Sequence, residues 1–123
     1  LHYQLPPKAQ AKLVRVTRGA ILDVVVDIRR SSPNFGRWIS LEISAERWNQ
    51  VLVPAGYAHG FVTLVERTEV LYKVSEYYSP EHDRSLRYDD PAIGIAWPDV
   101  AGGFQLSEKD RKAPSLADAE VFG

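Results

Sequence analysis

Residues 50–64 read QVLVPAGYAHGFVTL, two short runs of mainly apolar residues joined by a Pro54-Ala55-Gly56 turn. Val, Phe and Thr suit the pleated, half-buried surface of a β-strand, whereas proline followed by glycine interrupts regular structure. We therefore expect strands at 50–53 and 60–64 joined by a turn, with His59 at the entrance to the second strand.

The same pattern extends along the chain in both directions. Further runs rich in Val, Ile, Leu and Thr, bounded by turn residues, occur at 12–17, 20–28, 36–43 and 69–74. Short strands separated by turns are typical of an antiparallel sandwich or barrel. From residue 75 onwards only 107–111 and 116–121 have helical composition. The sequence predicts an all-β antiparallel fold with short C-terminal helical segments.

Composition narrows the classes of function. The chain has 123 residues, which fits a single domain over 1–123, and its net charge of -1 offers no basic surface for nucleic acid. It contains no cysteine, so disulfides are excluded and a metal would need His, Asp or Glu ligands. No apolar run approaches the roughly 20 residues that span a bilayer. We expect no membrane partner and a cytoplasmic location.

Alternation within the predicted strands assigns side chains to faces, because successive residues of a strand point in opposite directions. Lys12 shares a face with Val14 and Val16, which is unusual for a lysine. Tyr72 shares a face with Val70 and Val74 and is therefore expected to point inward. Asp23 and Asp27 fall on one face of the 20–28 run, which suggests a polar cavity or solvent on that side.

His2, Lys12, Tyr72 and Asp110 form a candidate proton-transfer set. A histidine can take a proton near neutrality, a tyrosine can return one, and a lysine can hold the negative oxygen formed in between. A carboxylate would fix the tautomer of the histidine. These residue types point to chemistry next to a carbonyl. Each also has a structural interpretation, such as a core tyrosine or a lysine lying along a sheet.

The turn at 54–60, PAGYAHG, resembles the PxGxxH turn of the cupin superfamily, in which a strand carries an inward histidine. Many cupins bind a metal through this histidine and a His-x-His cluster. This chain has no His-x-His, and its three histidines lack the usual spacing. We therefore expect no metal.

A longer set of motifs, in family order, resembles the dTDP-4-dehydrorhamnose 3,5-epimerase family over essentially the whole chain. The motifs are residues 1–4 (LHYQ), 12–15 (KLVR), 32–38 (SPNFGRW), 54–61 (PAGYAHGF), 71–73 (LYK), 77–81 (YYSPE), 88–91 (YDDP), 94–98 (GIAWP) and 106–110 (LSEKD). The resemblance implies a metal-free cupin-type jelly roll.

The resemblance also implies a role for each matching residue. His2 matches the general base and Tyr72 the general acid, while Asp110 matches the carboxylate that orients the base and Lys12 the lysine near the keto oxygen. Positions that bind substrate are matched by His59, Lys109, Asp83 and Tyr78, the last being the aromatic that stacks on thymine. Three positions depart from the common family residues: Asp83 replaces glutamate, Leu52 tryptophan and Val70 phenylalanine.

The implied activity is cofactor-free inversion of carbons 3 and 5 of dTDP-4-keto-6-deoxyglucose through an enolate, giving dTDP-4-dehydrorhamnose. Alternatives are an epimerase acting on one carbon only, a non-catalytic cupin that binds sugar nucleotides, and a metal-dependent cupin oxygenase. Relative to the family the N-terminal third is missing, since the chain starts at Leu1. We expect an upstream segment to complete the pocket, and a homodimer, because unpaired strand edges invite partners.

Overall fold

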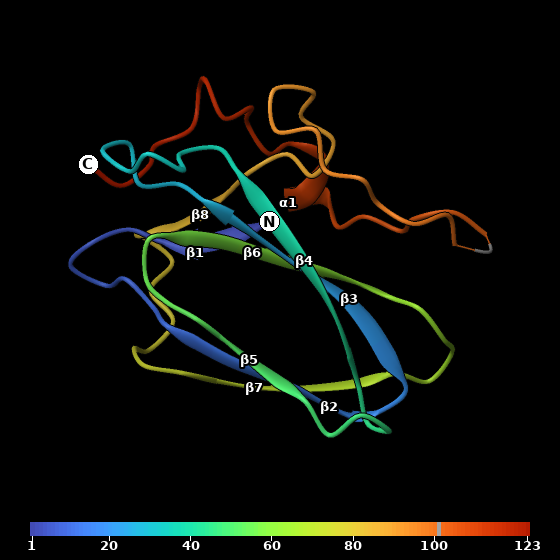
Figure 1. Cartoon of the computed structure of the whole chain (residues 1–123). Helices are drawn as coiled ribbons and strands as arrows, with labels where there is room; N and C mark the ends of the chain where they lie inside the picture. Colours follow the sequence, from blue (N-terminus) through green and yellow to red (C-terminus); the bar gives the residue numbers. More distant parts are fainter. Residues whose placement is uncertain (101) are drawn as a thin grey trace.

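The computed structural model describes residues 1–100 and 102–123. Two antiparallel sheets face each other, and the C-terminal third of the chain lies over the outer side of the larger one (Figure 1). Its elements are β1 (His2–Gln4), β2 (Lys12–Arg18), β3 (Ala20–Asp27), β4 (Trp38–Ser44), β5 (Gln50–Val53), β6 (Tyr57–Thr63), β7 (Glu69–Val74), β8 (Asp83–Ser85) and α1 (Glu108–Arg111). The predicted all-β antiparallel fold is confirmed.

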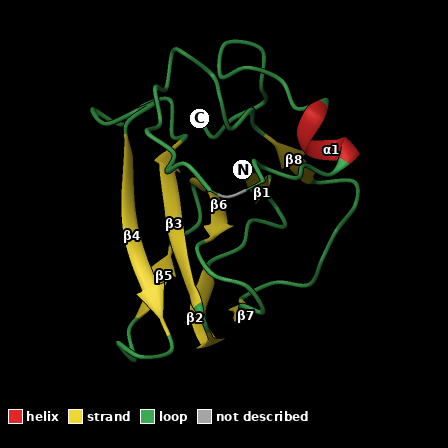
Figure 2. Cartoon of the chain, turned by 90° about the vertical axis from the view of Figure 1, so that its right-hand side faces the viewer, coloured by secondary structure: helices red, strands yellow, loops and turns green. Residues whose placement is uncertain are grey.

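The strand order is β4-β3-β6-β1-β8 in the larger sheet and β5-β2-β7 in the smaller sheet. Strand β3 is buried on both faces. Its Val24 and Val26 pack under the C-terminal segment, and its Ile21 packs against Val14 of the smaller sheet. Figure 2 shows the resulting arrangement, with C-terminal loops above the larger sheet and α1 next to β8. Two apolar layers therefore hold the larger sheet in place.

The turn between β5 and β6 explains why the 50–64 stretch folds as it does. Gly56 adopts a φ of +95°, and a Cβ there would lie 2.8 Å from a side-chain carbon of Arg29. A positive φ favours glycine, and the close approach leaves no room for a side chain. The turn lets β6 begin at Tyr57, three residues before the predicted start, and brings His59 inside the strand.

Some predicted elements differ from the structure. β4 begins at Trp38 because Gly36 has a φ of +80° and its N–H donates to Asp27 at the end of β3. Residues 116–121, predicted as helical, instead form a turn. The Asp90 carboxylate accepts from the Leu116 N–H, and the chain then continues to Phe122, which pairs with Arg29. That pairing requires extended backbone, so the helix prediction there is wrong.

Candidate active site

One wall of the site is a row of side chains across the larger sheet. His2 on β1 is the register partner of His59 on β6 and of Ser85 on β8, and His59 is the partner of Val25 on β3. Directly opposed residues of antiparallel strands project from the same face. The two histidines are therefore neighbours on the inner face of this sheet.

The opposite wall belongs to the smaller sheet. On β2, Lys12 and Val14 share a face, and Val14 is fully buried between the sheets. Tyr72 on β7 is the partner of Val14, which makes Lys12 and Tyr72 diagonal neighbours about 7–8 Å apart. The lysine and the tyrosine thus face the two histidines from the other sheet.

The candidate residues line one cavity of about 810 Å³ between these walls: His2, Lys12, His59, Tyr72, Tyr78, Asp83, Lys109 and Asp110. The cavity opens to solvent on the tyrosine side. Tyr72 points inward as expected but is 60% exposed, whereas His59 is 7% exposed. Of the three positions that depart from the family residues, Asp83 lines this cavity, Leu52 is exposed on β5, and Val70 on β7 packs against the buried cluster around Val14.

Asp110 reaches His2 from α1. The Ser107 hydroxyl caps this helix, accepting from the Asp110 N–H and donating to Asp110 Oδ2 at 3.0 Å. The carboxylate is thereby held with Oδ1 2.8 Å from His2 Nε2, although the ring N–H is not aligned on that oxygen. The other ring nitrogen, Nδ1, lies 3.5 Å from the Ser85 hydroxyl. Asp110 therefore lies close enough to favour a proton on Nε2, which leaves the lone pair of Nδ1 available.

The charge state of His2 follows from burial. Burial is the main cause that lowers the pKa of His2 to about 4, against the opposing effect of Asp110. For Asp110, burial raises the pKa, but His2 and the Ser107 hydroxyl outweigh it and the net pKa lies below the usual value. At neutral pH the pair is thus an imidazole next to a carboxylate, and His2 is free to accept a proton.

Lys12 is a mostly buried amine. Burial lowers its pKa, opposed by the carboxylates of Asp83 on β8 and Asp23 on β3, while Lys109 on α1 lowers it further. Lys109 forms an ion pair with Asp83 at the cavity wall. The space in front of His2 is therefore lined by both cationic and anionic groups. An anionic oxygen placed there would accept a hydrogen bond from the Lys12 amine.

A second histidine–carboxylate pair lies deeper, and sequence reasoning did not identify it. His59 Nε2 is 2.7 Å from Asp23 Oδ2, and Asp23 is 1% exposed with Oδ1 unpartnered. Asp27, on the same face of β3, is also buried and pairs with Arg29. Solvent, one of the two interpretations of this acidic face, is excluded for both. The signal in the sequence was a pair of carboxylates on a face shared with Ile21 and Val25.

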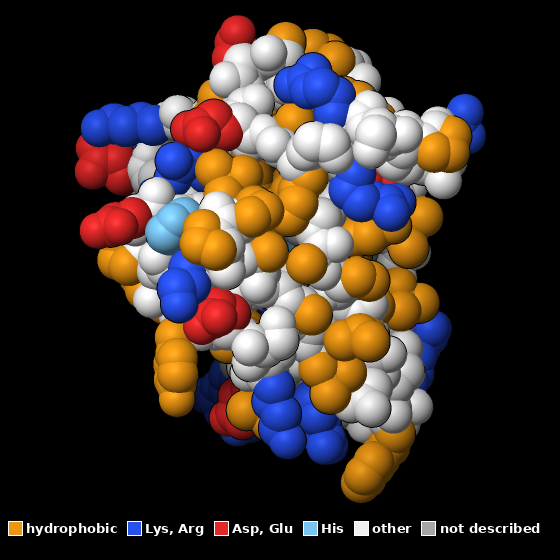
Figure 3. Space-filling model, turned by 90° about the vertical axis from the view of Figure 1, so that its left-hand side faces the viewer, with side chains coloured by type: hydrophobic (Ala, Val, Ile, Leu, Met, Phe, Trp, Pro, Cys, Tyr) orange, Lys and Arg blue, Asp and Glu red, His pale blue; other side chains and the backbone are white. Residues whose placement is uncertain are grey.

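Other kinds of site find little support in the described part of the chain. Among these residues no group of three or more His, Cys, Asp or Glu side chains is arranged to hold a metal ion. No helix there is long and apolar enough to cross a membrane. Figure 3 shows one face of the molecule, where acidic and basic side chains are interspersed with hydrophobic ones rather than gathered by sign.

Known proteins resemble this chain over nearly its whole length. The profile of the dTDP-4-dehydrorhamnose 3,5-epimerase family matches residues 1–118. The enzyme of that name from Sinorhizobium fredii is 56% identical over 121 residues, which cover 98% of this chain and 62% of the relative.

Two solved structures share the fold. A dTDP-6-deoxy-D-glucose-3,5-epimerase from Legionella pneumophila, in complex with dTDP-4-keto-L-rhamnose, has a TM-score of 0.92 and 42% identity, covering 98% of this chain and 63% of that one. A 3'-monoepimerase from Streptomyces bikiniensis, in complex with dTDP-quinovose, has a TM-score of 0.88 and 43% identity, covering 94% and 58%. The expected cupin-type jelly roll is confirmed. This chain spans less than two thirds of the length of each of these proteins.

Proposed function

The chain belongs to the dTDP-4-dehydrorhamnose 3,5-epimerase family, and from that membership we propose that the protein inverts carbons 3 and 5 of dTDP-4-keto-6-deoxyglucose. The observation that carries the proposal is the opposition of His2 on one sheet to Lys12 and Tyr72 on the other, across one cavity. Inversion needs a proton removed from one face of a carbon and returned to the opposite face, and this arrangement supplies a group on each side.

The reaction uses three groups in sequence. Nδ1 of the neutral His2 takes the proton from the carbon next to the ketone, and the electron pair of the broken C–H bond moves into an enolate. The Lys12 amine donates a hydrogen bond to the enolate oxygen. The Tyr72 hydroxyl then delivers its proton to the opposite face of the carbon. The imidazolium of His2 loses its proton to solvent and the Tyr72 phenolate regains one, so no cofactor is consumed.

Four further residues bind the substrate in this proposal. Tyr78, 67% exposed at the cavity mouth, stacks on the thymine ring, and Lys109 contacts the anionic linkage. His59, held by Asp23, contacts the sugar, and Asp83 places its carboxylate between Lys109 and Lys12. A homodimer, a cytoplasmic location and a single domain over 1–123 stay predictions.

A second candidate is an epimerase that inverts one carbon only, favoured by the similarity to the Streptomyces bikiniensis monoepimerase. Incubation with dTDP-4-keto-6-deoxyglucose in deuterium oxide, followed by NMR of the product, separates the candidates. We expect deuterium and inversion at carbons 3 and 5. Deuterium at one carbon alone supports the second candidate. Binding of dTDP without exchange at either carbon contradicts both and identifies a non-catalytic binding protein.

A further inference from the structure

Gln4 has a buried side chain whose carboxamide bonds only to backbone. It is the last residue of β1 and is 3% exposed, in the wall of the cavity. Its Nε2 donates to the carbonyl of Tyr77 at 3.2 Å and to that of Lys8 at 2.7 Å, and its Oε1 accepts from the Ser79 N–H at 2.9 Å. Both N–H groups and the oxygen are therefore used, as burial of an amide requires.

Two of these bonds lie on either side of Tyr78. Gln4 holds the carbonyl before this residue and the N–H after it, across more than seventy positions of sequence. Leu5, the residue after Gln4, also holds the segment that carries Tyr78. Its N–H donates to the His82 carbonyl, and the His82 N–H donates to the Ser79 carbonyl. The backbone of Tyr78 is thus fixed from the end of β1, although its ring is exposed.

Strand β1 carries both this clamp and the proposed base. His2 and Gln4 are two residues apart, so they project from the same face at a spacing of about 7 Å along the strand. A displacement of β1 would move both ends of the site together. The strand therefore sets the distance between the reacting carbon of the sugar and an aromatic ring that contacts the far end of the ligand.

We propose that Gln4 is a positioning residue: it holds the Tyr78 ring at the cavity mouth, so that the nucleobase end of a nucleoside-diphosphate sugar is bound in register with His2. This inference rests on the proposed function, because it takes Tyr78 to stack on the base. It adds a residue that does not contact the ligand and acts through Tyr78.

A double-mutant cycle on dTDP affinity tests the proposal. Stacking of a base on an aromatic ring makes Tyr78→Ala weaken dTDP binding by about 5- to 100-fold. We expect Gln4→Leu to weaken it by about 3- to 10-fold, since a displaced ring keeps part of its contact, and to have no further effect in the Tyr78→Ala background. The matched control is Gln50→Leu, the same substitution at an exposed position of β5 that does not line the cavity.

Hydrogen exchange and a milder variant keep the result interpretable. Exchange of the Ser79 amide should accelerate in Gln4→Leu and not in Gln50→Leu. Gln4→Asn keeps the carboxamide but shortens the side chain by one methylene, and it serves if Gln4→Leu fails to fold. Equal losses of affinity from Gln4→Leu in both backgrounds, or no loss in either, overturn the inference. If Tyr78→Ala itself leaves dTDP binding unchanged, the stacking role in the proposed function is wrong and the inference falls with it. If the protein lacks epimerase activity but the double-mutant cycle still shows coupling between Gln4 and Tyr78, only the proposed reaction is overturned.

Discussion

Replacing Tyr72 with phenylalanine removes one oxygen atom from the cavity wall that faces His2. Among the described residues no hydrogen bond to this hydroxyl is present, and the side chain is largely exposed, so the free energy of unfolding should change by less than about 0.5 kcal/mol. The effect on inversion should be large. A general acid contributes roughly 10²–10⁴-fold, which corresponds to about 3–5 kcal/mol of transition-state stabilisation.

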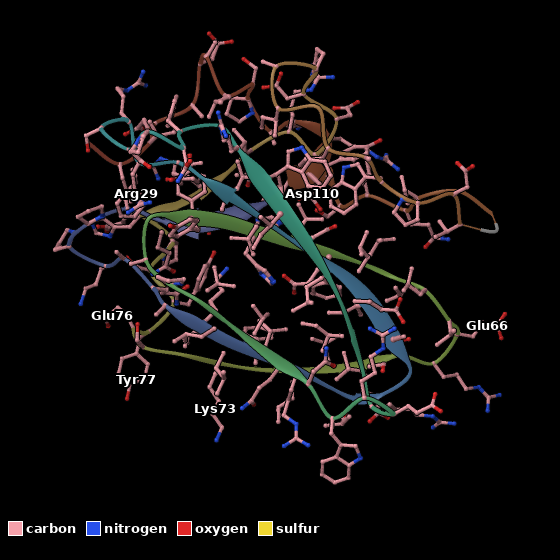
Figure 4. The ribbon with its side chains drawn as sticks, viewed as in Figure 1. Arg29, Glu66, Lys73, Glu76, Tyr77 and Asp110 are labelled. Atoms are coloured by element: carbon pink, nitrogen blue, oxygen red, sulfur yellow. The ribbon has the colours of Figure 1, made fainter. Side chains whose placement is uncertain are left out.

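The two half-reactions should respond differently. Proton abstraction by His2 does not use the hydroxyl, so Tyr72→Phe should still exchange substrate hydrogen with deuterium while forming little inverted product. NMR of the substrate pool and the product in deuterium oxide measures both rates. Tyr77→Phe is the matched control, because Tyr77 is 89% exposed and points away from the sandwich (Figure 4). Equal losses of exchange and inversion in Tyr72→Phe, or inversion at nearly the original rate, would refute the assignment of Tyr72 as the acid.

Three further predictions concern charges. The pKa of Asp27 is lowered from 3.8 to about 2, chiefly by hydrogen bonds from Arg29. A carboxyl group with a lowered pKa stabilises the fold above pH ~4, and this stabilisation is lost as the pH falls through 2. Asp27→Asn should therefore lower the free energy of unfolding by about 1–2 kcal/mol at pH 7, a value reduced for solvent screening at the half-exposed Arg29. Urea unfolding between pH 2 and 7 measures this, and an unchanged pH dependence in Asp27→Asn contradicts it. NMR titration of His2 should give a midpoint near pH 4, shifted lower in Asp110→Asn, and a midpoint at or above 6.5 contradicts the lowering of this pKa by burial. Asp23→Asn should destabilise by about 1.5–3 kcal/mol, because the carboxylate that bonds to His59 is buried. Asp89→Asn, at the exposed pair with Arg87, should destabilise less, and equal losses from the two variants count against the buried pair.

Alternation within strands accounts for most of the fold and part of the site. Lys12 shares a face with Val14, and Tyr72 shares a face with Val70. The alternation of side chains along a strand is therefore enough to predict that Lys12 and Tyr72 both lie on an inner face. β1 and β8 have three residues each, too few to show alternation; they are strands because they pair with each other and because β1 also pairs with β6. Their existence depends on tertiary pairing that local sequence does not encode.

The partners of the two histidines differ in how far sequence predicts them. Asp110 lies on a four-residue helix, and only the family resemblance predicts its approach to His2, because the sequence of residues 86–107 has no periodic hydrophobic pattern. Alternation places Asp23 on a face shared with Asp27, but the contact of Asp23 with His59 depends on the register between β3 and β6. The protonation of His2 depends on burial, which only the folded arrangement determines.

Deuterium uptake by the His2→Asn protein tests the central claim most directly. Asparagine keeps a polar side chain at this position but cannot accept a proton at neutral pH, and dTDP binding measured in parallel confirms that the cavity is intact. We predict that exchange at carbons 3 and 5 falls together by about 10²–10⁴-fold. Exchange at either carbon near the original rate, in a variant that binds dTDP normally, would contradict the account of His2 as the base.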